Sequence, residues 1–319
     1  FLKQEKSTNA GPDWKWMVRL DPLEASEKPE TLLVIGAKER KEITDVVVGE
    51  VWLCSGQSNM EVSFSAPGCA VLSNNPVVSK EAEGVDVPQI RLIGGVGAVV
   101  PVPQDLLFPR AGWAVCRTES LRPFSRVGYF FGLKLWKQLQ VPIGLVNVSR
   151  GCSSIEAWMP PTCFDTREDW KEYALEVGKI QELYRDLKGY GDREKEGVFE
   201  AHCKSRYGGF ANQFLVNGRP DLSKTANFLT HMLAVYASSL YNHAIRPLIP
   251  YAMRGVIWYQ GETNLRDRQY AIKQQALIES WRALWGRDFP FYLVQVAPKN
   301  GYQGLPEFWL EQYKAVRAV

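Results

Sequence analysis

The sequence predicts an α/β domain built on a five-stranded parallel sheet, preceded by a small segment of β-strands. From residue 49 onward, short apolar runs alternate with longer stretches of helical spacing, which is the pattern of parallel β/α proteins. Three of these apolar runs end in clusters of polar and small residues. Before residue 49, strand-like runs follow one another without helices. We therefore expect two units, residues 1–48 and residues 49–319.

The first unit contains three segments with the alternation or composition of strands, Asp13–Leu20, Thr31–Ile35 and Glu42–Val48. Alternating apolar and polar side chains favour a strand with one buried face. We expect these segments to belong to an N-terminal β-domain.

The second unit contains five short apolar runs rich in β-branched and aromatic residues, as expected for buried strands. They are Glu50–Cys54, Gln89–Ile93, Ile143–Val148, Gly255–Tyr259 and Phe291–Val296. Two stretches between them have apolar residues at helical spacing, Val127–Leu139 and Tyr270–Trp285, and Gly286 supplies a C-cap for the second.

A long polar insertion, at about residues 161–240, separates the third and fourth predicted strands. Its Asp169–Leu187 stretch is amphipathic and charged, which predicts helix, and a loop rich in Gly and Asn follows at 208–226. The insertion is too long for a plain connection, so we expect it to cover one end of the sheet.

Composition excludes several classes of function. The 38 basic and 35 acidic side chains nearly balance, and no run of Lys and Arg forms a stripe for phosphates, so we expect no nucleic-acid partner. No apolar stretch approaches the roughly 18 residues of a membrane span. The six cysteines show neither a CxxC pair nor a Cys/His metal spacing, so we predict no metal site. The 11 tryptophans suit carbohydrate stacking as well as a core.

The three polar clusters are Ser55–Met60, Ser149–Ser154 and Gln260–Asn264. Because catalytic groups of an open parallel sheet collect beyond the carboxyl ends of the strands, three such clusters predict one assembled active site. Ser58 is the candidate nucleophile, since a serine in a strand-to-helix turn presents its hydroxyl to the crevice. A helix N-cap is its structural alternative.

Two further residues are candidates for stabilising an oxyanion. Gly151 would offer its backbone N–H, with loop geometry as the structural alternative. Gln260 would offer its side-chain amide, with a buried, hydrogen-bonded glutamine as the alternative.

The sequence contains three long blocks, GEVWLCSGQSNME, then GLVNVSRGCSSIEAWMP, then LYNHAIRPLIPYAMRGVIWYQGETN. Taken in this order, the blocks resemble the sialate O-acetylesterase family of the SGNH hydrolases. The early segment DWKWMVRLDPL resembles the end of that family's N-terminal β-domain, and FSRVGYFFGLKL and LIESWRALWGRDFPFYLVQVAP also match. The resemblance covers most of the chain apart from the insertion.

This resemblance implies a flavodoxin-like α/β/α sandwich and cofactor-free hydrolysis of acetyl esters on sialic acid or a related sugar. Ser58 would be the nucleophile, and its own N–H, the N–H of Gly151 and the amide of Gln260 would form the oxyanion hole. Residues within or beside the matching blocks would have structural or substrate-positioning roles. They are Asn59, Glu156, Trp158, Glu262 and His243.

The chain departs from the family pattern at two places. Cys152 stands where the family has the second Gly of Trp-Gly-Gly-Thr. The family's Asp-x-x-His, which supplies the catalytic base, is expected beyond Val319, and none of His202, His231 and His243 lies in such a string.

The leading hypothesis is therefore a serine esterase that removes O-acetyl groups from a sugar. One alternative is an esterase acting on acetylated xylan or another polysaccharide. Another, of a different class, is a carbohydrate-binding protein that has the fold and lacks catalysis. Family members are often secreted, periplasmic or lysosomal, and the resemblance favours a secreted or periplasmic location.

Overall fold

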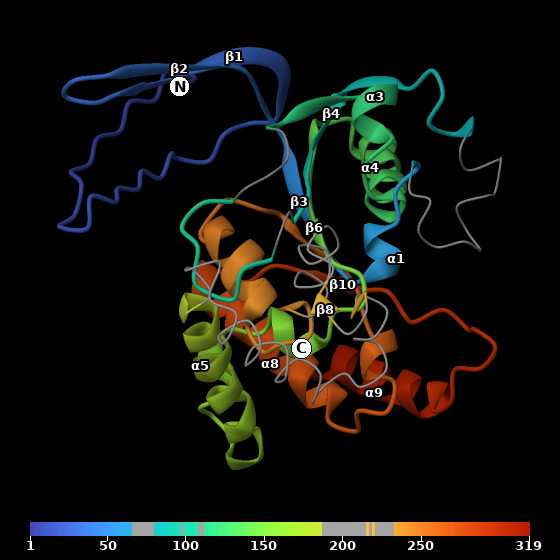
Figure 1. The fold of residues 1–319 in the computed structure, drawn as a ribbon. Helices are drawn as coiled ribbons and strands as arrows, with labels where there is room; N and C mark the ends of the chain where they lie inside the picture. The colour runs from blue at the N-terminus through green and yellow to red at the C-terminus, as the bar shows by residue number, and fades with distance from the viewer. Residues whose placement is uncertain (66–79, 97–98, 108–111, 187–214, 217–218, 221–232) are drawn as a thin grey trace.

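The structure is a computed structural model that describes residues 1–65, 80–96, 99–107, 112–186, 215–216, 219–220 and 233–319. Its main sheet has six strands in the order β10-β9-β3-β6-β4-β5 (Figure 1). These strands are β3 (Glu50–Gly56), β4 (Asp86–Gly94), β5 (Ala114–Arg117), β6 (Ile143–Ser149), β9 (Gly255–Tyr259) and β10 (Phe291–Leu293).

The prediction of an α/β fold with a parallel sheet is confirmed. The five predicted strands are the five that pair in parallel, with β3 at the centre between β9 and β6. A sixth strand, β5, pairs antiparallel with β4 at one edge. It escaped prediction because a strand of four residues is too short to show a clear pattern. The last strand is also shorter than predicted, since β10 ends at Leu293.

Helices cover both faces of the sheet (Figure 1). They are α1 (Ser58–Glu61), α3 (Thr118–Leu121), α4 (Arg126–Leu139), α5 (Lys171–Asp186), α8 (Tyr270–Trp285) and α9 (Leu305–Ala318). Short 3₁₀ or π turns connect them: η1 (Ile155–Trp158), η2 (Pro161–Cys163), η3 (Glu168–Trp170), η5 (Tyr241–Ile245), η6 (Arg246–Leu248) and η7 (Glu262–Asn264).

Alternation along the central strand divides the core into two layers. Trp52 and Cys54 belong to the cluster that includes Tyr129 of α4, whereas Leu53 belongs to the cluster that includes Leu277 of α8. Successive side chains of a strand point to opposite faces, so β3 contributes to both clusters. The sheet is therefore buried on both sides, as a parallel sheet requires.

Local capping explains where one helix begins and where another ends. The Ser125 hydroxyl accepts a hydrogen bond from Gly128 N at 3.0 Å and caps α4. Gly286 ends α8 in the left-handed conformation, with φ of 65°, which confirms the predicted C-cap.

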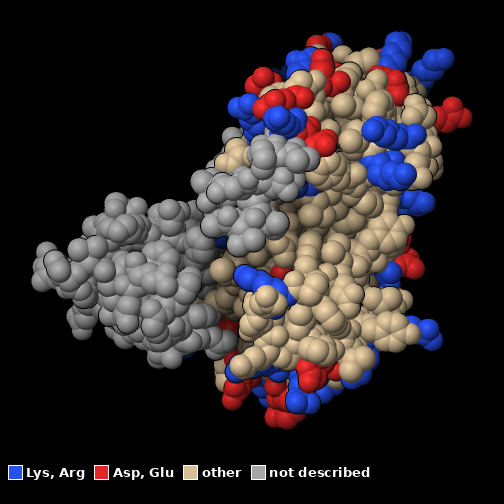
Figure 2. Space-filling view, turned by 90° about the vertical axis from the view of Figure 1, so that its right-hand side faces the viewer, with Lys and Arg blue, Asp and Glu red and all other residues tan. Residues whose placement is uncertain are grey.

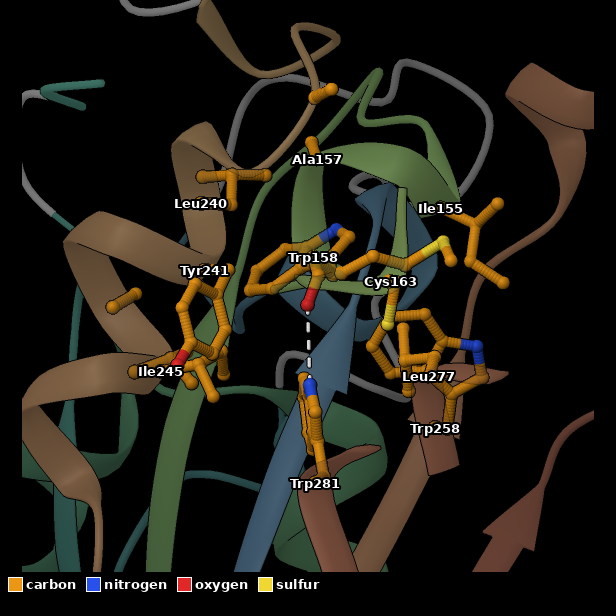
Figure 3. Packing of buried hydrophobic residues seen from close by; sticks show 14 of the residues in the cluster. Ile155, Ala157, Trp158, Cys163, Leu240, Tyr241, Ile245, Trp258, Leu277 and Trp281 are labelled. Carbon is orange, nitrogen blue, oxygen red and sulfur yellow. Dashed lines mark hydrogen bonds between the residues drawn. The ribbon is translucent and has the colours of Figure 1, made fainter. Parts of the chain in front are cut away.

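The layer between the sheet and α8 contains a cluster of tryptophans (Figure 3). Trp258 of β9 makes edge-to-face contacts with Trp158 and Trp281, each at a centroid distance of 5.9 Å. The Trp281 indole N–H donates to the carbonyl of Trp158 at 3.2 Å. These aromatic contacts fix η1, which follows β6, against the core.

The N-terminal region forms a hairpin of β1 (Ser26–Ile35) and β2 (Arg40–Val48). Two predicted strands therefore lie within β1 and β2, but the predicted strand at Asp13–Leu20 is wrong. That segment pairs with no described strand, and Trp14 has a φ of 61° and is 87% exposed. Without a partner strand, alternation alone does not form a strand.

The insertion is described only in part. The predicted helix at Asp169–Leu187 is observed as η3 followed by α5. In the predicted Gly- and Asn-rich loop only β7 (Leu215–Val216) and β8 (Arg219–Pro220) are described, as a short antiparallel pair, and the rest lies outside the described residues.

Charged residues of both signs are densest at the two ends of the face shown in Figure 2, and the surface between them is mostly uncharged. In the described part of the chain, no helix combines the length and the apolar character needed to cross a bilayer.

Candidate active site

The three polar clusters meet at the carboxyl end of the central strand. In the register of the sheet, Gly56 at the end of β3 lies opposite Ser149 of β6 on one side and Tyr259 of β9 on the other. The clusters that follow these strands are therefore neighbours in space. The structure brings together the segments that contain Ser58, Gly151 and Gln260, as the sequence predicted for one site.

The turn before Ser58 is fixed by backbone contacts and by one buried side chain. A Cβ on Gly56 would lie 2.2 Å from the carbonyl oxygen of Tyr259, so β3 and β9 approach closely only because residue 56 is glycine. Gln57 N donates to the same carbonyl at 2.8 Å, and the Gln57 side-chain oxygen accepts from Gly261 N at 3.1 Å. This turn places Ser58 at the start of α1.

Ser58 is half-buried. Within the described residues, neither its hydroxyl nor its N–H makes a hydrogen bond to the protein. A Cβ placed on Gly151 would lie 3.6 Å from the Ser58 Cβ, so the loop after β6 directly adjoins the candidate nucleophile. This geometry places the Gly151 backbone beside Ser58.

The Gly151 N–H already has an acceptor. It donates to Oε2 of Glu61 at 2.5 Å, and Glu61 lies one helical turn after Ser58 on α1. The Arg150 guanidinium lies 3.9 Å from the other carboxylate oxygen of Glu61. A carboxylate therefore occupies the N–H donor that was predicted for the oxyanion.

Gln260 is fully buried, and its amide group is hydrogen-bonded on both sides. Its Nε2 donates to Ser153 O at 3.0 Å and to Asn264 Oδ1 at 2.8 Å, and its Oε1 accepts from Tyr270 OH at 2.8 Å. Both amide hydrogens are thus committed inside the protein. The structure matches the alternative given for Gln260, and an oxyanion role requires one of these bonds to open.

Asn59 and Glu262 link α1 to the loop after β9. Asn59 Nδ2 donates to Glu262 Oε1 at 2.5 Å, while Glu262 Oε2 is buried without a hydrogen-bond partner in the described part of the chain. Burial raises the pKa of the Glu262 carboxyl, and the bond from Asn59 opposes this effect. Asn59 follows Ser58 directly in the chain, so this bond fixes the loop after β9 against the start of α1.

Glu156 and Trp158 are buried on η1 and face the core. The Trp158 indole N–H donates to the Ser153 hydroxyl at 3.0 Å, and Glu156 pairs with Lys273 at 2.6 Å. Of the two roles predicted for them, structural or substrate-positioning, this burial favours the structural one.

His243 is 5% exposed and lies on η5. Its Nε2 contacts the carbonyl of Val96, and its Nδ1 is buried without a hydrogen-bond partner among the described residues. Burial lowers the pKa of this imidazole, the bond to Val96 raises it, and the Arg150 charge lowers it. No hydrogen bond joins His243 to Ser58, and His202 and His231 lie outside the described residues.

Cys152, the residue that departs from the family pattern, is exposed and has a left-handed φ of 60°. The conformation is one that glycine adopts without strain. The backbone at residue 152 therefore has a conformation that favours glycine, although the residue there is cysteine.

Three residues of this region were not found by sequence reasoning. Glu61 follows Ser58 by three positions, and that helical spacing could have identified it. Asn264 lies within the third block, and Lys273 lies on the predicted helix after it. A lysine at a core-facing position of an amphipathic helix is the signal that could have indicated a buried ion pair. Among the described residues, no group of three His, Cys, Asp or Glu could hold a metal ion.

Comparisons with known proteins find sialate O-acetylesterases among the relatives of this chain. The chain is 28% identical to the human sialate O-acetylesterase over 333 residues, which covers 96% of this chain and 52% of that protein. It is 28% identical to the mouse sialate O-acetylesterase over 318 residues, with coverage of 93% and 53%. The chain thus spans about half the length of the curated relatives it matches. No family model matches the chain.

Among solved structures, a carbohydrate acetylesterase from Xanthomonas citri superimposes with a TM-score of 0.65 and 27% sequence identity. The match covers 96% of this chain and 56% of that one. Sequence and structure point to the same group of esterases, and the chain is a distant homologue of the sialate O-acetylesterases.

Proposed function

We propose that the protein is a serine esterase that removes O-acetyl groups from sialic acid or a related acetylated sugar. The observation that carries this proposal is the position of Ser58, at the carboxyl end of the central strand and beside Gly151. Its hydroxyl and N–H make no hydrogen bond to the described protein, so both are available to a substrate.

In the proposed reaction the Ser58 oxygen attacks the acetyl carbonyl carbon, and a base takes the hydroxyl proton. The tetrahedral intermediate then expels the sugar oxygen, which leaves with that proton. Water hydrolyses the acetyl-enzyme to acetate and restores Ser58. The family resemblance assigns the base to an Asp-x-x-His motif.

The negative charge of the intermediate needs preorganised donors. The Ser58 N–H is free for this purpose, and the Gly151 N–H becomes available when the Glu61 carboxylate moves away. The Gln260 amide is the third proposed donor, and it would have to release Ser153 O or Asn264 Oδ1. Of the three donors, the Ser58 N–H is the one that has no acceptor among the described residues.

The substrate class is tested by measuring acetate release from O-acetylated sialic acid and from acetylated xylan with the full-length protein. The proposal predicts release from the sialic acid at a much higher kcat/KM. Preference for xylan would support the polysaccharide alternative, and release from neither, with sugar still bound, would indicate a carbohydrate-binding protein.

A further inference from the structure

A buried charged network lies behind the two loops that flank Ser58. The Lys273 ammonium on α8 contacts Glu156 Oε1 at 2.6 Å and Asp267 Oδ2 at 2.7 Å. The Lys273 and Glu156 side chains are 4% and 7% exposed. The Tyr173 hydroxyl completes the shell around the ammonium at 3.0 Å. Both charged side chains are therefore buried inside the protein.

Asn264 connects this network to the candidate site. Its Nδ2 donates to Glu156 Oε2 at 3.2 Å. Its Oδ1 accepts from Gln260 Nε2 at 2.8 Å and from Ile155 N at 3.0 Å. Gln260 in turn donates to Ser153 O, two residues after Gly151. A continuous chain of hydrogen bonds therefore runs from Lys273 to the loop that adjoins Ser58.

Lys273 and Glu156 are charged groups removed from water, and the cost of that burial indicates a role other than stability. Burial alone would raise the pKa of Glu156, but the Lys273 charge and the hydrogen bonds around the carboxylate lower it. Burial would lower the pKa of Lys273, and the two carboxylates raise it. A buried ion pair often contributes no more stability than apolar side chains of the same size. Its presence here is better explained by the geometry that it imposes on the two loops.

We propose that Lys273 is a positioning residue for the esterase reaction and that it acts through its ion pairs with Glu156 and Asp267. Through Asn264 and Gln260 it holds the loop after β9 and the Gly151–Ser153 loop in the spacing that the oxyanion requires. This inference rests on the proposed function, because it assigns the network a part in the same reaction.

The test is Lys273→Met in the full-length protein, with Leu277→Ala as the matched control. Leu277 lies one turn later on α8, is fully buried and belongs to the apolar core (Figure 3). Both variants lose a buried side chain of the same helix, but only the first breaks the network. Each is assayed with p-nitrophenyl acetate at a temperature at which circular dichroism shows it folded.

Lys273→Met should lower kcat by about 10²-fold with KM nearly unchanged, which is the effect of a misplaced catalytic group. Leu277→Ala should keep the wild-type kcat. Hydrogen exchange at the amides of residues 151–153 should accelerate in Lys273→Met and not in Leu277→Ala. This second readout does not depend on activity.

Asp267→Asn is the second test variant if Lys273→Met does not fold. Asp267 is partly exposed, and Asn keeps an oxygen acceptor for Lys273. It should lower kcat less than Lys273→Met and in the same direction. The inference is overturned if both variants keep the wild-type kcat and exchange rates while Ser58→Ala is inactive. If the wild-type protein hydrolyses no acetyl ester, the proposed function fails instead.

Discussion

The Glu61 carboxylate accepts a hydrogen bond from Gly151 N at 2.5 Å, beside the Cβ of Ser58. The two residues come from neighbouring segments at the carboxyl end of the sheet. Glu61 lies on α1, which follows β3, and Gly151 lies in the loop after β6. A carboxylate oxygen on this N–H is in the position proposed for the negative oxygen of the tetrahedral intermediate. The side chain and the reaction intermediate would therefore compete for one donor.

Glu61→Gln should raise kcat/KM because a neutral amide oxygen holds the Gly151 N–H less tightly than a carboxylate does. A charge-assisted hydrogen bond exceeds a neutral one by about 1 kcal/mol, which corresponds to roughly a fivefold increase. The measurement is steady-state hydrolysis of p-nitrophenyl acetate by the full-length protein. A fall in kcat/KM would show instead that Glu61 holds the Gly151 loop in its active shape.

Gln260→Ala should lower kcat by about 10²–10³-fold with little change in KM, as for loss of one oxyanion donor. The matched control is Gln274→Ala, since Gln274 is also buried but its amide makes no hydrogen bond in the described part of the chain. The control should keep the wild-type kcat. If KM rises in Gln260→Ala while kcat holds, Gln260 serves substrate binding and not the transition state.

Cys152→Gly should stabilise the protein by about 0.5–1 kcal/mol. A non-glycine residue in the left-handed region costs about 1–2 kcal/mol, and the greater freedom of glycine in the unfolded chain offsets part of that gain. Urea unfolding followed by circular dichroism measures the change in the free energy of unfolding. A loss of stability would mean that contacts of the Cys152 side chain outweigh the strain at its φ of 60°.

His243→Gln should make stability less dependent on pH below neutrality. The folded-state pKa of His243 lies below its ordinary value of 6.5, mainly because of burial, so the unfolded chain binds a proton more readily. Stability from neutral His243 is present above pH 6.5 and is lost as the pH falls toward the folded-state pKa, by at most about 1.4 kcal/mol per pH unit.

The measurement is the free energy of unfolding of both proteins between pH 8 and pH 5. Gln keeps an amide N–H for the Val96 carbonyl, so the variant isolates the titration. Equal slopes for the two proteins in this range would show that the titration of His243 does not contribute to the pH dependence of stability.

Much of the fold could be predicted because it depends on local patterns. The apolar runs Ile143–Val148 and Gly255–Tyr259 indicate buried strands, and Gly286 marks a helix end. The edge strand β5 could not be found, because a strand of four residues has too little pattern. The alternation at Asp13–Leu20 wrongly predicted a strand, because a strand also needs a partner strand to pair with. The division near residue 48 stays a prediction.

The candidate site was predictable in part for a similar reason. The sequence places Ser58, Gly151 and Gln260 after strands, and the sheet topology then brings their segments together. Which hydrogen bonds those residues make depends partly on partners far away in the chain. Gly151 donates to Glu61, 90 residues earlier, and Gln260 donates to the carbonyl of Ser153, 107 residues earlier. Such long-range pairs follow from packing, which no local pattern reports.

A covalent acetyl-enzyme on Ser58 can be detected by trapping that intermediate. The full-length protein is mixed with p-nitrophenyl acetate, quenched in acid and digested, and the masses of its peptides are measured by mass spectrometry. We expect one acetyl group on the peptide that contains Ser58, and loss of both the label and the turnover in a folded Ser58→Ala variant. Acetylation of a different residue, or hydrolysis by Ser58→Ala at more than a few per cent of the wild-type rate, would contradict the proposal that Ser58 is the nucleophile.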